Sequence, residues 1–170
     1  MSFFVAGWYL VYTKPRQEKK VATQLSKSDI KTFLPVFKNK GNRVDGKKLG
    51  FTPLFPSYVF VQLKSMTDYY TCADTDGVIT YVKFGKKITR VKDEVIQNIS
   101  MLVDNCPDIA VLSGNVHSGQ KVRIEDGPLS GLSCEIAEHE GQQKVLVHVS
   151  VLNLYIVVNV SLNKYLIEMC

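Results

Sequence analysis

Two segments of this chain, residues 8–13 and 57–63, are rich in aromatic and β-branched residues, which favours strands. Successive side chains of a strand point to opposite faces, so period-2 alternation assigns each residue to a face. In residues 57–63 one face carries Ser57, Val59, Val61 and Leu63 and the other Tyr58, Phe60 and Gln62, while in residues 8–13 Trp8, Leu10 and Tyr12 share one face opposite Tyr9 and Val11. Both faces are therefore largely apolar. One must cover helices, and the other is either buried as well or an exposed aromatic patch of the kind that marks a partner site.

The composition indicates a globular protein of one or two small domains. The 170 residues are 45% hydrophobic and 22% charged. No run of 18 apolar residues suggests a membrane span, and the first residues lack the charged start and long apolar stretch of a signal peptide. The four cysteines are widely spaced without a CxxC pair, which favours reduced thiols. We therefore expect a cytoplasmic protein.

Charge is distributed unevenly along the chain. Residues 1–101 hold 17 Lys and Arg against 8 Asp and Glu, whereas residues 102–170 hold 4 against 8. A basic N-terminal half suits a surface near a nucleic-acid backbone, although a charged run is more often only a solvated face. The acidic C-terminal half favours a protein partner.

The rest of the N-terminal half reads as helices and strands around those two segments. Pro15 fits the first turn of a helix whose apolar stripe is Val21, Ala22 and Leu25. Residues 33–37 predict one short strand, and the cationic, glycine-containing residues 38–48 predict a flexible hairpin tip. A turn at Gly77 begins a strand that we expect to continue through residues 86–91. Residues 93–103 then predict a core-facing helix.

The C-terminal half changes to short alternating strands. Residues 104–117 show no sustained period and predict a linker or a weakly ordered arm. After them, five short strands in about 55 residues predict a small closed barrel of the SH3-like kind. Val145, Val147, Val149 and Val151 would line one face of a strand but scatter around a helix, so we expect this segment to stay β.

No catalytic constellation is present in the sequence. The three histidines lie far apart, and none accompanies a cysteine or serine in a nucleophile motif. The glycine-rich stretch after residue 126 lacks the Lys-Ser/Thr ending of a phosphate loop. We expect neither an enzyme nor a metal or other cofactor.

Three motifs in order carry a family resemblance. They are Trp8-Tyr-Leu-Val-Tyr-Thr-Lys-Pro-Arg-Gln-Glu18, Pro53-Leu-Phe-Pro-Ser-Tyr-Val-Phe-Val61 and Gly119-Gln-Lys-Val-Arg-Ile-Glu-Asp-Gly-Pro-Leu-Ser-Gly-Leu132. The set resembles the NusG family of transcription elongation factors. The resemblance implies an α+β N-terminal domain, with an antiparallel sheet flanked by helices, over residues 4–104. A linker over 105–116 would join it to a small all-β SH3-like KOW barrel over 117–170.

The resemblance also implies which residues meet partners. Tyr12, Phe55, Tyr58 and Phe60, with Trp8 beside them, match the pocket that binds the clamp helices of the largest RNA polymerase subunit. The basic helix and hairpin would lie near non-template DNA at the transcription bubble, through Lys14, Arg16, Lys19, Lys20, Lys47 and Lys48. Gly127, Pro128 and Gly131 match the KOW turn, although Cys134 stands where a further glycine is usual. Asp68 to Tyr70 depart from the polar motif with which the RfaH paralogue touches the opposite jaw of the polymerase cleft.

The implied function is transcription elongation or antitermination without membrane association. The residue sequences of the first two motifs are similar to those of the UpxY-like and RfaH-like branches, which act on long polysaccharide operons. The KOW domain would bind Rho, a ribosomal protein, or neither. The alternative function is a ribosome- or RNA-associated KOW protein, which would not need the aromatic sheet.

Overall fold

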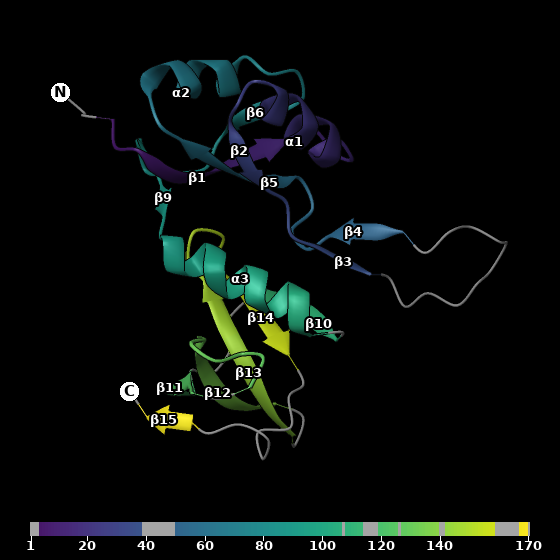
Figure 1. Cartoon of the computed structure of the whole chain (residues 1–170), viewed down its shortest axis with the longest axis vertical. Coiled ribbons are helices and arrows are strands. Elements are labelled where there is room, and N and C mark those ends of the chain that lie inside the picture. Colours follow the sequence, from purple (N-terminus) through teal and green to yellow (C-terminus); the bar gives the residue numbers. More distant parts are fainter. Residues whose placement is uncertain are drawn as a thin grey trace, which may run out of the picture. The chain divides into compact units, whose positions relative to one another are not determined.

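The structure is a computed structural model that describes residues 4–38, 50–106, 108–113, 119–125, 127–139, 142–158 and 167–169 (Figure 1). The chain divides into two compact units, Met1–Ile96 and Gln97–Cys170. This division falls within helix α3 (Asp93–Asn105). The predicted boundary after residue 104 lies later in the same helix.

The first unit is built on an antiparallel pair of central strands. β1 (Gly7–Thr13) pairs with β5 (Tyr58–Leu63), and β2 (Lys31–Phe33) lies on the other side of β5. The free edge of β1 is taken by β6 (Val78–Tyr81) and β9 (Arg90–Val91). The pairs Tyr12↔Tyr58 and Leu10↔Phe60 put those residues on one face, which confirms the predicted alternation.

Helices α1 (Glu18–Lys27) and α2 (Met66–Ala73) cover the opposite face of this sheet (Figure 1). The shared core holds helix residues and inward-facing strand residues, all buried: Tyr9, Val11, Val21, Leu25, Ile30, Val59, Val61, Leu63, Cys72 and Tyr81. Tyr81 stacks on Tyr69 at 4.6 Å between ring centroids and donates its hydroxyl to the Tyr69 carbonyl. One face of the sheet is thereby closed by the helices, as expected.

The start of α1 differs from the prediction. Pro15 is not in the first helical turn, because Arg16 has a φ of 63° and the helix begins only at Glu18. This left-handed residue turns the chain before the helix. Glu18 is then buried, and its Oε1 accepts a hydrogen bond of 2.7 Å from the Ser57 amide. The Ser57 carbonyl in turn accepts from the Thr13 amide at 2.8 Å, so Glu18 ties the helix to both central strands.

Two other predicted strands are divided. Residues 33–37 were expected as one strand, but β2 ends at Phe33 and β3 (Val36–Lys38) starts after Pro35, which has no amide to donate. β3 pairs with β4 (Phe51–Pro53), and the hairpin tip predicted between them lies mostly outside the described residues. Similarly, Gly85 has a φ of 63° and turns residues 83–88 into a hairpin of β7 (Lys83–Phe84) and β8 (Lys87–Ile88).

The second unit begins within α3, and its described residues form a six-stranded antiparallel sheet. Its strands are β10 (Ile109–Ser113), β11 (Gln120–Ile124), β12 (Ser133–His139), β13 (Gln142–Val149), β14 (Leu154–Val158) and β15 (Ile167–Met169), in the spatial order β10-β14-β13-β12-β11-β15. The pairs Val145↔Val158 and Val147↔Ile156 align buried side chains on one face. The valine-rich segment is thus β up to Val149, as its alternation predicted, but Val151 lies in the turn after β13 and not on the strand.

The predicted linker contains a strand. β10 lies within residues 105–116 and pairs with β14 over its full length, from Ile109↔Val158 to Ser113↔Leu154. The prediction of an irregular linker therefore does not hold for residues 109–113. This strand has no clear alternation, and it is fixed by backbone hydrogen bonds to a partner more than forty residues later, which no local pattern reveals.

The first prediction concerns the Glu18–Ser57 bond. Glu18→Ala is expected to lower the free energy of unfolding by about 1–3 kcal/mol, because the Ser57 amide loses a charged acceptor at a partly buried position. Urea unfolding followed by circular dichroism measures this. Glu18→Gln keeps an acceptor oxygen and should lose less; equal losses in both variants would show that packing rather than the hydrogen bond is responsible.

A second prediction concerns the entry into β11. A Cβ added at Gly119 would collide with the carbonyl of Ile136, which is backbone on the paired strand β12. Gly119→Ala is expected to destabilise the second unit by about 1–3 kcal/mol, measured by the same unfolding experiment. Gly50→Ala is the control, since a Cβ there meets nothing within 4 Å. A Gly119→Ala protein as stable as this control would contradict the register of β11 against β12.

Candidate functional site

The sheet face opposite α1 and α2 gathers aromatic side chains from three strands, and we call it the aromatic face. It comprises Trp8, Leu10 and Tyr12 of β1, Tyr58 and Phe60 of β5, and Phe33 of β2. The Tyr12 and Tyr58 rings lie 5.3 Å apart between centroids, and Phe33 lies 5.9 Å from Phe60. Phe55, which precedes β5, meets Phe60 edge-on at 6.2 Å. Four of the five predicted pocket residues thus share this face, and Phe55 contacts it.

The predicted residues differ in accessibility. Phe60 and Phe55 are buried, as is Trp8, over whose ring Lys31 Nζ lies at 5.8 Å from the centroid. Tyr12 is 36% exposed and Tyr58 is partly exposed. Phe60 lies on the same face as Tyr58, as the alternation predicts, but it is buried whereas Tyr58 is partly exposed. The accessible rings of this face are those of Tyr12, Tyr58 and the partly exposed Phe33, whereas Phe55 and Phe60 are buried.

Phe33 belongs to the aromatic face but was not among the predicted pocket residues. Its strand, β2, is three residues long, too short for alternation to assign a face. Its place on this face follows from the pairing Phe33↔Phe60, which depends on the tertiary structure and cannot be read from the local sequence.

Four predicted basic residues, Lys14, Arg16, Lys19 and Lys20, lie just before and in the first turn of α1, and we call them the basic cluster; Lys14 and Lys20 lie beside one carboxylate. Asp76 lies 2.6 Å from Lys20 Nζ and 3.8 Å from Lys14 Nζ, and all three side chains are at least half exposed. The hydrogen bond from Lys20, followed by the charges of Lys20 and Lys14, lowers the pKa of Asp76. The carboxylate stays ionised and partly cancels two of the four cations of this cluster.

The other predicted cations are less constrained or lie elsewhere. Lys19 donates to the Phe51 carbonyl at 2.9 Å, which draws it toward β4. Arg16 is exposed, and neither of the ion pairs found among the described residues includes it. Lys47 and Lys48 lie outside the described residues.

The predicted KOW turn has the backbone conformation that its glycines suggested. Gly127 and Gly131 have φ values of 82° and 90°, a region that residues with a Cβ rarely adopt. The Gly131 amide donates to the Ile124 carbonyl at 2.7 Å, and Leu129 between the glycines is buried. Pro128 sits in the same turn. These contacts give the turn a structural role.

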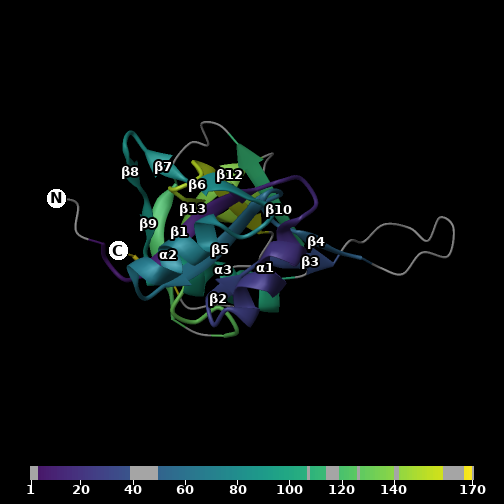
Figure 2. The ribbon, with the colours of Figure 1, turned by 90° about the horizontal axis from the view of Figure 1, so that it is seen from above.

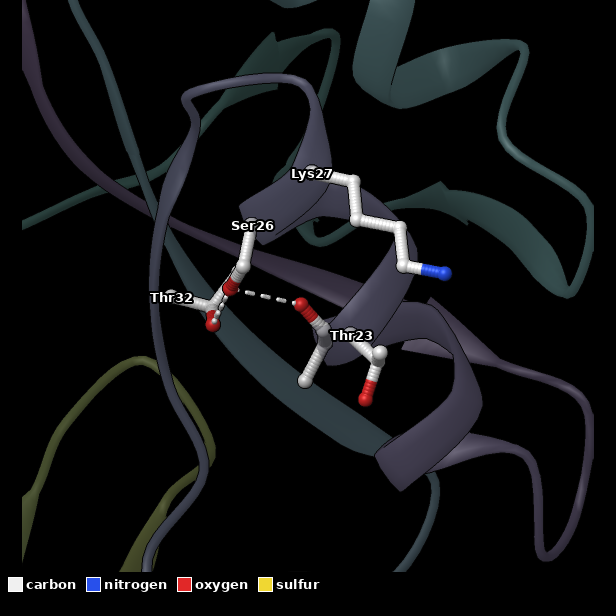
Figure 3. A pocket seen from close by; sticks show the side chains of 5 residues that line it. Thr23, Ser26, Lys27 and Thr32 are labelled. Carbon is white, nitrogen blue, oxygen red and sulfur yellow. Dashed lines mark hydrogen bonds between the residues drawn. The ribbon is translucent and has the colours of Figure 1, made fainter.

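The part of the surface that the structure describes includes two open hollows. One is lined by Ala22, Thr23, Ser26, Lys27 and Thr32 beside α1 (Figure 3). Its hydroxyls are already engaged: Thr23 donates to the Lys19 carbonyl and Ser26 to the Ala22 carbonyl, each at 2.9 Å. The other hollow adjoins the KOW turn, between residues 123–125 and 130–131. Neither brings together groups for a reaction.

The described part of the chain gives little support for a reactive thiol, a metal site or a membrane-spanning helix. Burial raises the pKa of the Cys72 thiol to about 11, so this core cysteine is protonated at neutral pH. The described residues include no cluster of three or more His, Cys, Asp or Glu that could hold a metal ion. Among the described helices, none is long and apolar enough to span a membrane.

Comparison with solved structures shows what this fold is similar to. The structure of NusG from Thermotoga maritima aligns with a TM-score of 0.53 and 23% identity, covering 92% of this chain and 95% of that one. One structure of the MjSpt4:Spt5 complex aligns with a TM-score of 0.36 and 16% identity, covering 89% of this chain and 97% of the other. The first supports an α+β domain joined to a small all-β domain, as predicted.

The sequence comparison is more specific. A family model described as transcription termination factor NusG matches residues 6–100, which include β1, the aromatic face and the basic cluster. Since this match spans more than half of the chain, the chain belongs to the NusG family, whose members are transcription factors rather than enzymes.

Proposed function

We propose that this protein is a transcription elongation and antitermination factor that binds the clamp helices of RNA polymerase through its aromatic face. The observation that carries the proposal is the Tyr12–Tyr58 pair, which is accessible on a face where Trp8 and Phe60 are buried. Tyrosine combines a large apolar ring with a polar hydroxyl and is enriched where partners bind. A helical partner packing over the two rings would bury them fully.

Beneath the tyrosines, the buried residues hold the site in place. Phe60 is packed between Phe33 and Phe55, and Leu10 pairs with it across the central strands. A rigid support limits the conformational entropy that binding must remove. We therefore assign Trp8, Phe55 and Phe60 a positioning role and Tyr12 and Tyr58 the direct contact.

We further propose that the basic cluster contacts non-template DNA near the transcription bubble. Lys14 and Arg16 lie in the connection between β1 and α1, and Lys19 and Lys20 in the first turn of α1; these cations would meet phosphates without reading sequence. Lys47 and Lys48 would extend this surface. The bound factor would suppress pausing or termination, on specific long operons such as those for polysaccharides, in the manner of UpxY-like or RfaH-like paralogues.

We also propose the domain boundaries and the partners of the C-terminal domain. Residues 4–104 form the polymerase-binding domain and residues 117–170 the KOW domain, which meets Rho or a ribosomal protein in the cytoplasm. A ribosome-associated role would not require the sheet and its tyrosine pair, which favours the polymerase. Co-purification with core polymerase against ribosomes separates the two functions.

The third prediction tests the aromatic face. Replacing both Tyr12 and Tyr58 with Ala should weaken binding to core RNA polymerase by roughly thirtyfold or more, because tyrosines central to an interface often contribute about 2 kcal/mol or more. Phe60 is left intact, since a charged residue at this buried position would unfold the domain. Binding is measured by biolayer interferometry and folding by circular dichroism.

The control for this variant is Phe51→Ala, which removes an exposed aromatic ring of β4 outside the aromatic face. It should bind polymerase like the unmodified protein. A folded tyrosine double variant that also binds normally would refute the assignment of the clamp contact to this face.

A fourth prediction uses Asp76 to test the DNA contact. Asp76→Asn removes the carboxylate that holds Lys14 and Lys20, so the factor in an assembled elongation complex should crosslink more strongly to non-template DNA. Arg16→Gln should have the opposite effect and lower the salt-dependence slope by about one unit, since one phosphate contact is lost. Polymerase binding should survive both changes.

Asp74→Asn is the matched control. Asp74 and Asp76 are both exposed in the connection between α2 and β6, but Asp74 takes no part in the ion pairs with Lys14 and Lys20. It should change crosslinking less than Asp76→Asn. Weaker crosslinking on loss of the Asp76 charge would mean that the lysines require their carboxylate and do not face DNA.

A further inference from the structure

The β7–β8 hairpin is a fixed projection from the edge of the first sheet. Its base is held by two backbone hydrogen bonds, from Val82 N to the Leu10 carbonyl at 2.8 Å and from Thr89 N to the Val82 carbonyl at 3.1 Å. β6 before it and β9 after it both pair with β1, so both ends of the projection are anchored on one strand. Figure 2 shows the hairpin beside β6 and β9.

The tip of this hairpin presents an aromatic ring to solvent. Phe84 is 88% exposed, more than any other exposed large hydrophobic residue identified in the described chain. Gly85 supplies the left-handed conformation that turns the chain directly after it. Burying a phenylalanine contributes about 1.5–3 kcal/mol, and Phe84 contributes almost none of this to the fold. A single exposed apolar residue is common, however, so its neighbours must decide what it indicates.

The neighbours of Phe84 are cations. Lys83, Lys86 and Lys87 are all exposed, and Arg90 and Lys92 follow, while residues 82–92 contain no Asp or Glu. The ion pairs found among the described residues both go to Asp76, so none neutralises the hairpin. The tip therefore combines one free aromatic ring with three uncompensated lysines.

This combination favours a nucleic acid over a protein as partner. The centres of protein interfaces are depleted in lysine, because each buried ammonium must be desolvated. Sites for single-stranded nucleic acid instead join positive charge, which follows the phosphates, to aromatic rings on which unpaired bases stack. A duplex keeps its bases stacked internally and offers no face to Phe84.

We propose that the β7–β8 hairpin binds single-stranded DNA, with Phe84 stacking on an unpaired base and Lys83, Lys86 and Lys87 contacting the flanking phosphates. The choice of DNA rests on the proposed function, which brings the non-template strand to this unit. The hairpin follows β6, whereas Asp76 and its lysines precede it. The start of β6, which follows Asp76, and its end, where the hairpin begins, are therefore separated by a four-residue strand of roughly 13 Å. The lysines beside Asp76 and the lysines of the hairpin thus form distinct contacts.

The first test measures the contact directly in the full chain. Phe84→Trp places an indole at the tip, and stacking on a base should quench its emission when an oligothymidylate of about twelve nucleotides is added. The unmodified protein, whose single tryptophan Trp8 is buried, supplies the background signal. Unchanged emission at saturating oligonucleotide would overturn the proposal.

The second test separates stacking from charge and from general apolar contact. Phe84→Leu keeps an apolar side chain without a π face and should bind the oligonucleotide roughly tenfold more weakly. Lys86→Gln with Lys87→Gln should weaken binding and lower the salt slope by about two units. Tyr70→Ala, which removes a 59% exposed ring on α2, is the control and should bind normally.

The same variants distinguish this inference from the proposed function. Polymerase binding by Phe84→Leu should equal that of the unmodified protein, and Tyr12→Ala with Tyr58→Ala should still bind the oligonucleotide. Loss of polymerase binding with unchanged DNA binding in Phe84→Leu would overturn the proposal and assign the tip to a protein contact. Tighter binding of the matching oligouridylate would overturn the choice of DNA.

Discussion

The pairing of β1 with β5 is the constraint on which the first unit depends. Its register runs from Gly7↔Leu63 to Tyr12↔Tyr58 without interruption. Because side chains alternate, this one register sends Val11 and Val59 toward the helices and the tyrosine pair toward the other face. A slip of one residue would exchange the two faces, exposing valines and burying tyrosine hydroxyls beneath α1 and α2. Core and candidate binding surface are thus set by the same hydrogen bonds.

Glu18 links this sheet to the basic cluster. Its carboxylate holds the Ser57 amide at the start of β5, and the same helix start presents Lys19 and Lys20. Gly77, before β6, leaves no room for a Cβ, which would lie 2.7 Å from Gln17 Oε1 and 2.8 Å from Val21 Cγ2. The loop carrying Asp76 is therefore held against α1, and this close packing brings the carboxylate to Lys14 and Lys20.

Sequence reasoning failed where accessibility or long-range pairing decided the outcome. Alternation placed Tyr58 and Phe60 on one face correctly, but it cannot tell which of them is covered. Phe60 pairs with Leu10 and is flanked by Phe33 and Phe55, contacts that come from three separate parts of the chain. In the same way, the segment that forms β10 shows no strand pattern of its own because its partner β14 lies far along the chain.

The sequence by itself determined the two-faced central strands, the order of the motifs, the valine-rich β segment and the glycine turn at 127–131. These features depend on side-chain alternation and on backbone conformations that only glycine adopts easily, so residues close together in the sequence are enough to predict them. The tertiary structure alone decided that Asp76 restrains Lys14 and Lys20, that Phe60 is buried while Tyr12 is accessible, and that residues 83–88 fold into a projecting hairpin. These depend on distances between residues far apart in the chain, or on which surfaces remain uncovered after packing, and neither is encoded in a local pattern.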